Sequence, residues 1–161
     1  NPSGIQGICP SGWHVPSNPE WCELENYIEP GIDVNCNSIG YRGSMAKKLA
    51  APQHWSTYSS NSFAPGYWHT DTTGFNTCGF SAIPAGRYHT YFSYSGNAYS
   101  SVYYENKNHL GYWWSCTLDN NDNIYYRYLS YSNSGVYMTY TKNALTNHTY
   151  YYAHSVRCIK N

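Results

Sequence analysis

Six cysteines lie scattered along the chain between Cys9 and Cys158, and no other feature of the sequence restricts the fold as strongly. They form no CxxC pair and no Cys/His spacing of the zinc-finger kind. An even number of dispersed cysteines favours disulfides in an oxidising compartment over metal binding. The alternative to full pairing is that one or two cysteines stay buried and reduced. We therefore expect an extracellular or cell-surface protein that disulfides stabilise.

The length and the charge exclude several classes of function. A chain of 161 residues is expected to form one domain, 1–161, alone or as the C-terminal part of a larger surface protein. Nine Lys and Arg balance nine Asp and Glu, so there is no excess positive charge to attract nucleic acid or an anionic membrane. No apolar run approaches a membrane span, and no signal segment stands at Asn1. We expect a mature or excised chain without direct membrane insertion.

Two short helices are predicted in the first half of the chain. Ser17 precedes Glu20 by three residues, as in a capping box, and apolar residues follow at helical spacing, namely Trp21, Leu24 and Ile28. Pro30 and Gly31 end this helix. A second helix is expected from Ser44 through Met45, Ala46 and Leu49, until Pro52 stops it.

Strands and long loops are predicted from Trp55 onward, where Tyr, Val, Ile and Thr gather in short runs between turn formers. Residues 123–131 and 136–141 flank a four-residue turn and indicate a hairpin. A last strand is expected over 151–159, where His154, Val156 and Cys158 alternate with other residues. Helices first and strands later predict an α+β domain with a twisted antiparallel sheet.

Five blocks of sequence follow one another along the chain: GICPSGWHVPS at 7–17 with Glu20-Trp21 after it, GFSAIPAG at 79–86, GYWWS at 111–115, YYRYL at 125–129 and SVRC at 155–158. In this order they resemble the signature of the Fibrobacter succinogenes major paralogous domain. The resemblance implies a C-type-lectin-like fold, related to formylglycine-generating enzymes, in secreted or surface proteins of Bacteroidetes and Fibrobacter-like bacteria. Most members of that family have no assigned activity.

The resemblance also implies how the six cysteines pair. Cys9 and Cys158 both stand in family blocks, and a disulfide between them would join the two ends of the domain. Cys78 and Cys116 depart together from the common family pattern, which is most simply explained by one bridge between them. Cys22 and Cys36 would then close a short loop after the first helix. Residues 142–154 are longer than the equivalent family stretch and predict an added loop before the last strand.

No arrangement of residues points to catalysis. The seven histidines show no HExxH spacing, and no GxSxG, Walker or GxGxxG motif occurs. His14 lies in the GWHVPS block and is interpreted as a hydrogen-bonded structural histidine. We expect no enzyme activity and no catalytic residue. The alternative is an oxidase-like enzyme related to the formylglycine-generating proteins, which needs free, reactive thiols.

Calcium is the one cofactor that the sequence leaves open. The Glu-Pro-Asn, Gln-Pro-Asp and Trp-Asn-Asp motifs with which C-type lectins bind sugars through Ca²⁺ do not occur. A run of oxygen-bearing side chains at 119–123 makes Asp119 and Asp122 weak candidates for Ca²⁺ ligands. An Asx-rich turn between strands explains this run equally well.

Tyrosine dominates the second half, because 16 of the 20 tyrosines lie between Tyr88 and Tyr152 among many Asn and Ser. Tyr brings a large amphipathic contact area and Asn and Ser bring adaptable hydrogen bonds, as in an antibody paratope. We expect a ligand-binding surface that draws on Tyr91, Tyr94, Asn97, Tyr99, Tyr103, Tyr104, Asn106, Asn108, Tyr128, Tyr131, Tyr137, Tyr140 and Asn143. Its ligand would be a protein or glycan on another cell, as for an adhesin or pilus-tip module. The alternative is a carbohydrate-binding module of a cell-surface or fibre-degrading system.

The same composition suggests how such a surface arises. Some C-type-lectin-like proteins are diversified by retroelements that mutate template adenines, and an AAC codon treated in this way never yields Lys, Glu, Gln, Met or Trp. Within 88–152 these types are few, namely Glu105, Lys107, Trp113, Trp114, Met138 and Lys142. The alternative is that this family is simply rich in Tyr, Asn and Ser there.

Overall fold

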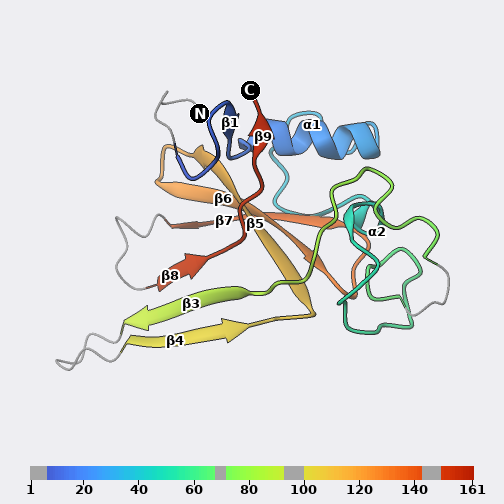
Figure 1. The fold of residues 1–161 in the computed structure, drawn as a ribbon. Helices are drawn as coiled ribbons and strands as arrows, with labels where there is room; N and C mark the ends of the chain where they lie inside the picture. The colour runs from blue at the N-terminus through green and yellow to red at the C-terminus, as the bar shows by residue number, and fades with distance from the viewer. Residues whose placement is uncertain (1–6, 68–71, 93–99, 143–149) are drawn as a thin grey trace.

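The computed structural model describes residues 7–67, 72–92, 100–142 and 150–161 (Figure 1). In these ranges the predicted α+β architecture with two short helices and antiparallel sheets is confirmed, although two short strands also lie before and between the helices. The elements are β1 (Trp13–His14), α1 (Asn18–Ile28), β2 (Gly40–Arg42), α2 (Ala46–Leu49), β3 (Arg87–Phe92), β4 (Ser100–Glu105), β5 (Leu110–Leu118), β6 (Asn123–Ser130), β7 (Val136–Lys142), β8 (Tyr150–Ala153) and β9 (Ile159–Lys160). No helix in the described part of the chain is long and apolar enough to cross a membrane.

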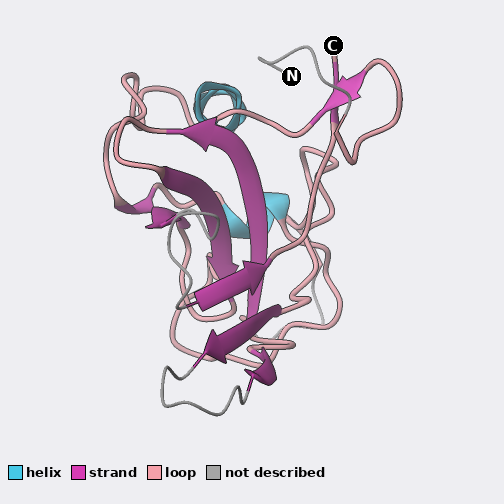
Figure 2. Ribbon diagram, turned by 90° about the vertical axis from the view of Figure 1, so that its left-hand side faces the viewer, coloured by secondary structure: helices cyan, strands magenta, loops and turns pink. Residues whose placement is uncertain are grey.

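All strand pairs in these ranges are antiparallel and form three sheets. A four-stranded sheet has the order β2-β7-β6-β5, and a three-stranded sheet has the order β4-β3-β8. A small third sheet pairs β1 with β9 and so joins the two end segments of the fold. In Figure 1, α1, β1 and β9 lie at the top and β3 and β4 at the bottom, and Figure 2 shows the long strands curving between them.

Both predicted helices are present. Ser17 Oγ accepts a hydrogen bond from the Glu20 N–H, and the Glu20 carboxylate accepts one from the Ser17 N–H at 2.7 Å, so the capping box is confirmed. The helix ends at Ile28, directly before the predicted stop. The second helix is a single turn, shorter than the predicted segment, because Ala50 already has an extended backbone.

The hairpin prediction is confirmed and the last-strand prediction is wrong. β6 pairs with β7 in a continuous register that places Leu129 opposite Val136. The predicted strand over 151–159 is divided into β8 and β9, which pair with different partners. Between them, Ser155 lies two residues after the end of β8 and bonds to the edge of β5, where the Ser155 N–H donates to the Tyr112 carbonyl. This tertiary contact interrupts the strand although the alternation of side chains continues in the sequence.

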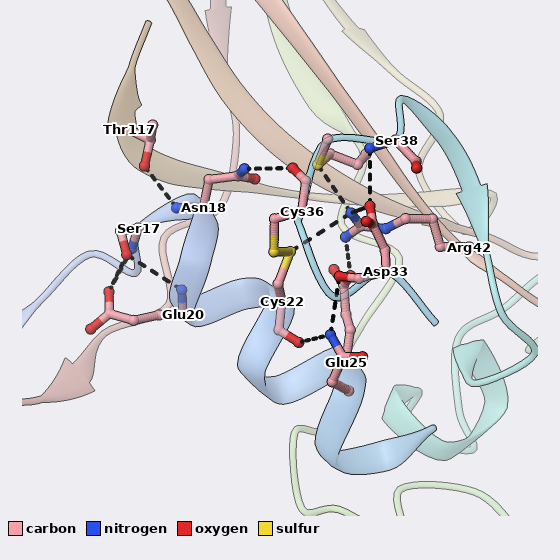
Figure 3. The surroundings of a disulfide bond; sticks show 12 residues. Ser17, Asn18, Glu20, Cys22, Glu25, Asp33, Cys36, Ser38, Arg42 and Thr117 are labelled. Carbon is pink, nitrogen blue, oxygen red and sulfur yellow. Dashed lines mark hydrogen bonds and ion pairs between the residues drawn. A yellow bond between two sulfur atoms is a disulfide. The ribbon is translucent and has the colours of Figure 1, made fainter. Parts of the chain in front are cut away.

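One face of the four-stranded sheet packs against the helices and forms the core. Its buried members are Trp21, Met45, Ala46, Leu49, Ala82, Trp113, Leu129 and Val136. An ionic cluster lies beside this apolar group: the fully buried Arg127 donates through Nε to Glu25 at 2.8 Å, and Arg42 donates to Glu25 and to Asp33. Figure 3 shows Arg42 between these two carboxylates. The cluster fastens α1 and the loop after it to the sheet.

Two of the three predicted disulfides are confirmed, Cys9–Cys158 and Cys22–Cys36. The second lies next to the ionic cluster in Figure 3. The predicted bridge between Cys78 and Cys116 is wrong, because both cysteines are free. Cys78 donates to the Lys48 carbonyl of α2, whereas Cys116 is exposed on β5. The two departures from the family pattern are thus separate features of different elements.

Candidate functional site

The three-stranded sheet presents two faces that differ in environment. Strand pleating places Tyr88 of β3, Val102 and Tyr104 of β4 and Tyr151 of β8 on one face, since Tyr88 lies opposite Tyr104 while Thr90 lies opposite both Val102 and Tyr151. We call these four residues the outer face. Their exposed fractions are 52%, 62%, 47% and 36%. Side chains of this size and polarity at such exposure lie on the surface and make this face a candidate contact surface.

The outer face is held in a defined shape by cross-strand contacts. The Tyr88 and Tyr104 rings lie 4.6 Å apart and tilted, which orders two aromatic side chains that would otherwise move freely. The Tyr104 hydroxyl donates to the Ala85 carbonyl at the start of β3. Aromatic rings fixed in this way lose little entropy when a ligand binds.

The opposite face of the same sheet turns toward the four-stranded sheet. Arg87 forms an ion pair with Glu105 at 2.7 Å, and its guanidinium lies over the rings of Tyr112 and Tyr152 at 5.0 and 4.7 Å. His89 stacks on Tyr103, the neighbour of Tyr104 on β4. Arg87 therefore joins β3 to β4 through its ion pair and joins the small sheet to β5 through its cation–π contact with Tyr112.

His154, directly after β8, is the second anchor between the two sheets. Its ring stacks on Trp114 at 4.1 Å and on Tyr112 at 5.0 Å and meets Tyr126 edge-on at 4.6 Å. Neither ring nitrogen has a hydrogen-bond partner within the described structure. Burial, and secondarily the charge of Arg87, lowers the pKa of His154 to about 3. The residue is therefore a neutral aromatic spacer at physiological pH.

A row of four tyrosines crosses the other large face, the side of the four-stranded sheet that points away from the helices. Tyr41, Tyr137, Tyr128 and Tyr112 are direct cross-strand neighbours on β2, β7, β6 and β5. The Tyr128 and Tyr137 rings stack at 4.6 Å with an interplanar angle of 15°. Burial and a hydrogen bond with Tyr41 raise the pKa of Tyr128, so its hydroxyl stays protonated. Exposure increases along the row from the buried Tyr112 to the exposed Tyr41.

The predicted contact residues are distributed over several surfaces. Tyr104 lies on the outer face, Tyr103 on the reverse of the same strand, and Tyr128 and Tyr137 in the tyrosine row. Tyr140 is exposed but lies on the opposite side of β7 from Tyr137, against Tyr125. Tyr91 lies in β3, opposite Ser101 of β4 and Tyr150 of β8 in the strand register. The remaining predictions Tyr94, Asn97, Tyr99 and Asn143 fall outside the described residues.

Three predicted contact residues shape loops. Asn106 and Asn108 both have positive φ in the turn between β4 and β5, and Asn106 Nδ2 donates to the Tyr112 hydroxyl at 3.0 Å. Tyr131 ends β6 and packs edge-on against Tyr58 and His109. These three residues thus shape the turn before β5 and the loop after β6.

The geometry also bears on the other candidate residues. Asp119 accepts hydrogen bonds from the Asn121 and Asn123 N–H groups and from the Asn123 amide, which lowers the pKa of Asp119 and makes an Asx-type turn. Asp122 takes a positive φ in this turn. No group of three His, Cys, Asp or Glu side chains fit for a metal occurs among the described residues. Both ring nitrogens of His14 lie at hydrogen-bond distance from side chains, as its structural interpretation requires.

A cleft with a volume of about 280 Å³ lies between α1, the loop before β3 and the C-terminal segment. Its apolar wall includes Trp21, Leu24 and Phe80, and Arg157 and the Cys78 thiol stand at its border. The Arg157 guanidinium lies over the Phe80 ring and donates to the Phe80 carbonyl. Although Cys116 is exposed to solvent, partial desolvation and the nearby Glu20 raise the pKa of its thiol, the opposite of what an activated nucleophile needs.

Four further surface residues are absent from the predicted contact set, namely Tyr88, Val102, Tyr151 and Tyr41. For the first three a signal was present, because period-two alternation along each strand marks one face. Tyr41 lies far from the tyrosine-rich half and joins the row only through the pairing of β2 with β7.

Comparisons with known proteins place the chain in a family. No curated protein and no solved structure matches it. The model of the Fibrobacter succinogenes major domain matches residues 3–160, nearly the whole chain and all five sequence blocks. The chain therefore belongs to the Fibrobacter succinogenes major domain family.

Proposed function

We propose that this protein is a non-enzymatic, extracellular recognition domain on a C-type-lectin-like scaffold, and that the outer face binds a protein or a glycan on another cell. The observation that carries the proposal is the exposure of four large side chains, Tyr88, Val102, Tyr104 and Tyr151, on one face of a small sheet. Two disulfides are compatible with an oxidising compartment. An adhesin or pilus-tip module has this kind of surface.

The ring geometry favours a mixed contact surface over a sugar-stacking platform. A carbohydrate-binding module stacks a sugar on the free face of an aromatic ring. The rings of Tyr88 and Tyr104, like those of Tyr128 and Tyr137, instead lie against each other with their centroids 4.6 Å apart, so one face of each ring is already covered by its partner. The carbohydrate-binding module therefore stands as the second candidate.

The binding test compares two variants of the full chain. The outer-face variant carries Tyr88→Ser, Tyr104→Ser and Tyr151→Ser, and the control carries Tyr27→Ser, an 82% exposed tyrosine of α1. Fluorescently labelled protein is applied to a glycan array and to bacterial and epithelial cells. We expect the outer-face variant to lose at least about tenfold in affinity and the control to bind like the wild type. Equal binding by all three proteins contradicts the proposal.

Treating the cells with protease or periodate before the binding assay shows whether the ligand is a protein or a glycan. Protease treatment abolishes binding to a protein ligand, whereas periodate oxidation abolishes binding to a glycan. Array signals that survive in the outer-face variant but are lost on substitution of Trp13, an exposed tryptophan of β1, would favour the carbohydrate-binding module.

We further propose that the tyrosine-rich tract is diversified by a retroelement. The outer face lies within this tract, and most of its side chains are of the types that adenine mutagenesis of AAC codons yields. The test is the DNA around the gene. A reverse transcriptase and a near-copy of the segment for residues 88–161 that differs at adenines are expected, and the lack of both leaves a surface of fixed specificity.

A further inference from the structure

Strand β4 has one hydrogen-bonding edge without a partner. It pairs with β3 at six consecutive positions, from Arg87 opposite Glu105 to Phe92 opposite Ser100. On its other side the described structure has no strand, bridge or backbone hydrogen bond. Figures 1 and 2 both show β4 at the rim of the molecule. Among the described residues, the N–H and C=O groups that alternate residues of β4 point away from β3 thus have no backbone partner.

The corresponding edge of the large sheet is covered. Along β5 the Leu110 carbonyl accepts from Gly86, the Tyr112 carbonyl accepts from Ser155, and the N–H groups of Trp114 and Cys116 donate to Ser155 and Pro16. The chain thus covers its long edge strand with loop segments at four alternate positions. Within the described residues, β4 has no such cover along its outer edge.

Natural edge strands are usually protected against pairing by Lys, Pro or a bulge. The sequence of β4, SSVYYE, contains neither residue, and its register with β3 runs without a shift. Its one charge, Glu105, is already neutralised by Arg87. The neighbouring side chains Val102, Tyr103 and Tyr104 are large and exposed, so a further strand would find apolar contacts as well as hydrogen bonds.

We propose that β4 pairs with β4 of a second copy of this chain, antiparallel and about a two-fold axis, so that β8-β3-β4 of each copy joins one six-stranded sheet. A two-fold axis perpendicular to the sheet requires the same strand, β4, of both copies to pair across the axis. With Tyr103 on the axis, Val102 lies opposite Tyr104 of the second copy, and such pairs of β-branched and aromatic residues stabilise antiparallel sheets.

Charge supports a second copy as the occupant. In this register Ser101 lies opposite Glu105 of the second copy, so no two like charges meet across the strands. The chain has zero net charge, and two copies approach without long-range repulsion. The dimer does not depend on the proposed ligand. It would bring the outer faces of two copies into one continuous surface and so raise the avidity for a repeated ligand.

The test is the mass in solution of the full chain without any ligand. By sedimentation or light scattering over a wide concentration range, we expect the wild type to rise from 18.4 kDa toward twice that mass. A lysine variant, Val102→Lys with Tyr104→Lys, sets lysines against lysines of the second copy and is expected to stay monomeric. A glutamate variant, Val102→Glu with Tyr104→Glu, is expected to do the same.

A mixture of the lysine and glutamate variants distinguishes a loss of edge pairing from damage to the fold. An equimolar mixture of the lysine and glutamate variants is expected to regain the doubled mass, because opposite charges then face each other across the strands. A control with Val34→Lys and Ile39→Lys, exposed residues between α1 and β2, is expected to dimerise like the wild type. A wild type that stays monomeric, a lysine variant that dimerises, or a mixture that stays monomeric overturns the proposal. A monomeric wild type would leave the edge to an extended segment of another protein.

Discussion

Arg127 and Glu25 lie 102 positions apart in the sequence and form an ion pair in the interior, with Arg127 Nε 2.8 Å from Glu25 Oε1. Arg42 donates to the second oxygen of the same carboxylate. Two arginines and the carboxylates of Glu25 and Asp33 therefore balance one another beneath the four-stranded sheet. Buried charges of this kind are tolerated only while every partner is in place.

Replacing Glu25 by Gln tests this balance. The substitution keeps the shape of the side chain but leaves two buried guanidinium groups with one carboxylate, so unfolding should become easier by about 3 kcal/mol. Urea denaturation followed by circular dichroism measures the change. Glu23→Gln, on the exposed side of the same helix, is the control and should stay within about 0.5 kcal/mol of the wild type. A similar small effect for both variants would show that the cluster contributes little.

His154 predicts a pH dependence of stability. Its pKa is lowered from 6.5 to about 3 in the folded protein, so below pH 6.5 the unfolded chain binds a proton that the folded chain does not. Stability is therefore lost as the pH falls from 6.5 toward 3, by at most about 1.4 kcal/mol per pH unit. His154→Phe keeps the stacking on Trp114 and removes two unpaired ring nitrogens, so at pH 7 it should be at least as stable as the wild type.

The measurement is the difference in unfolding free energy between His154→Phe and the wild type from pH 7 to pH 4. We expect it to widen steadily in favour of the variant as the pH falls. Contributions of other groups cancel in this difference, and His54→Asn, at an exposed loop position with positive φ, should leave the slope unchanged. Parallel profiles for His154→Phe and wild type would mean that His154 becomes protonated in the folded state near its ordinary pKa.

The pairing of the cysteines predicts how much the mass of the chain rises on reduction. Two disulfides gain two protons each on reduction, so the mass should rise by four protons rather than six. Iodoacetamide applied to the unfolded, unreduced chain should add two groups, at Cys78 and Cys116, and Cys116→Ser should reduce this to one. A chain that takes up no label before reduction would contain the third bridge after all.

Local signals allowed the first part of the fold to be predicted, and tertiary contacts determined the rest. The capping box at Ser17 and the turn between β6 and β7 act within a few residues and are visible in the sequence. The break between β8 and β9 depends on a bond from Ser155 to β5 and has no local signal. Arg127 looks like a surface residue by type, since its partner Glu25 is distant in sequence. Chemical composition located the tyrosine-rich tract, but only strand register separates the outer face from the tyrosine row.

Gly86 fixes the start of β3 and thereby the placement of the outer face. It has a φ of +70°, and a Cβ there would lie 2.3 Å from the Glu105 carbonyl oxygen and 2.8 Å from the Lys107 nitrogen. Gly86→Ala should therefore destabilise both through backbone strain and through a clash with the end of β4. Gly12→Ala is the matched control, because Gly12 has a φ of +78° and no atom within 4 Å of the added methyl group. Thermal and urea unfolding should show Gly86→Ala less stable than Gly12→Ala by about 1–3 kcal/mol.

Because the clash lies where β4 ends, Gly86→Ala should also weaken ligand binding by the outer face while Gly12→Ala leaves it intact. Equal losses of stability in the two variants would mean that β4 yields to the methyl group, and that the close approach of Gly86 does not fix the sheet.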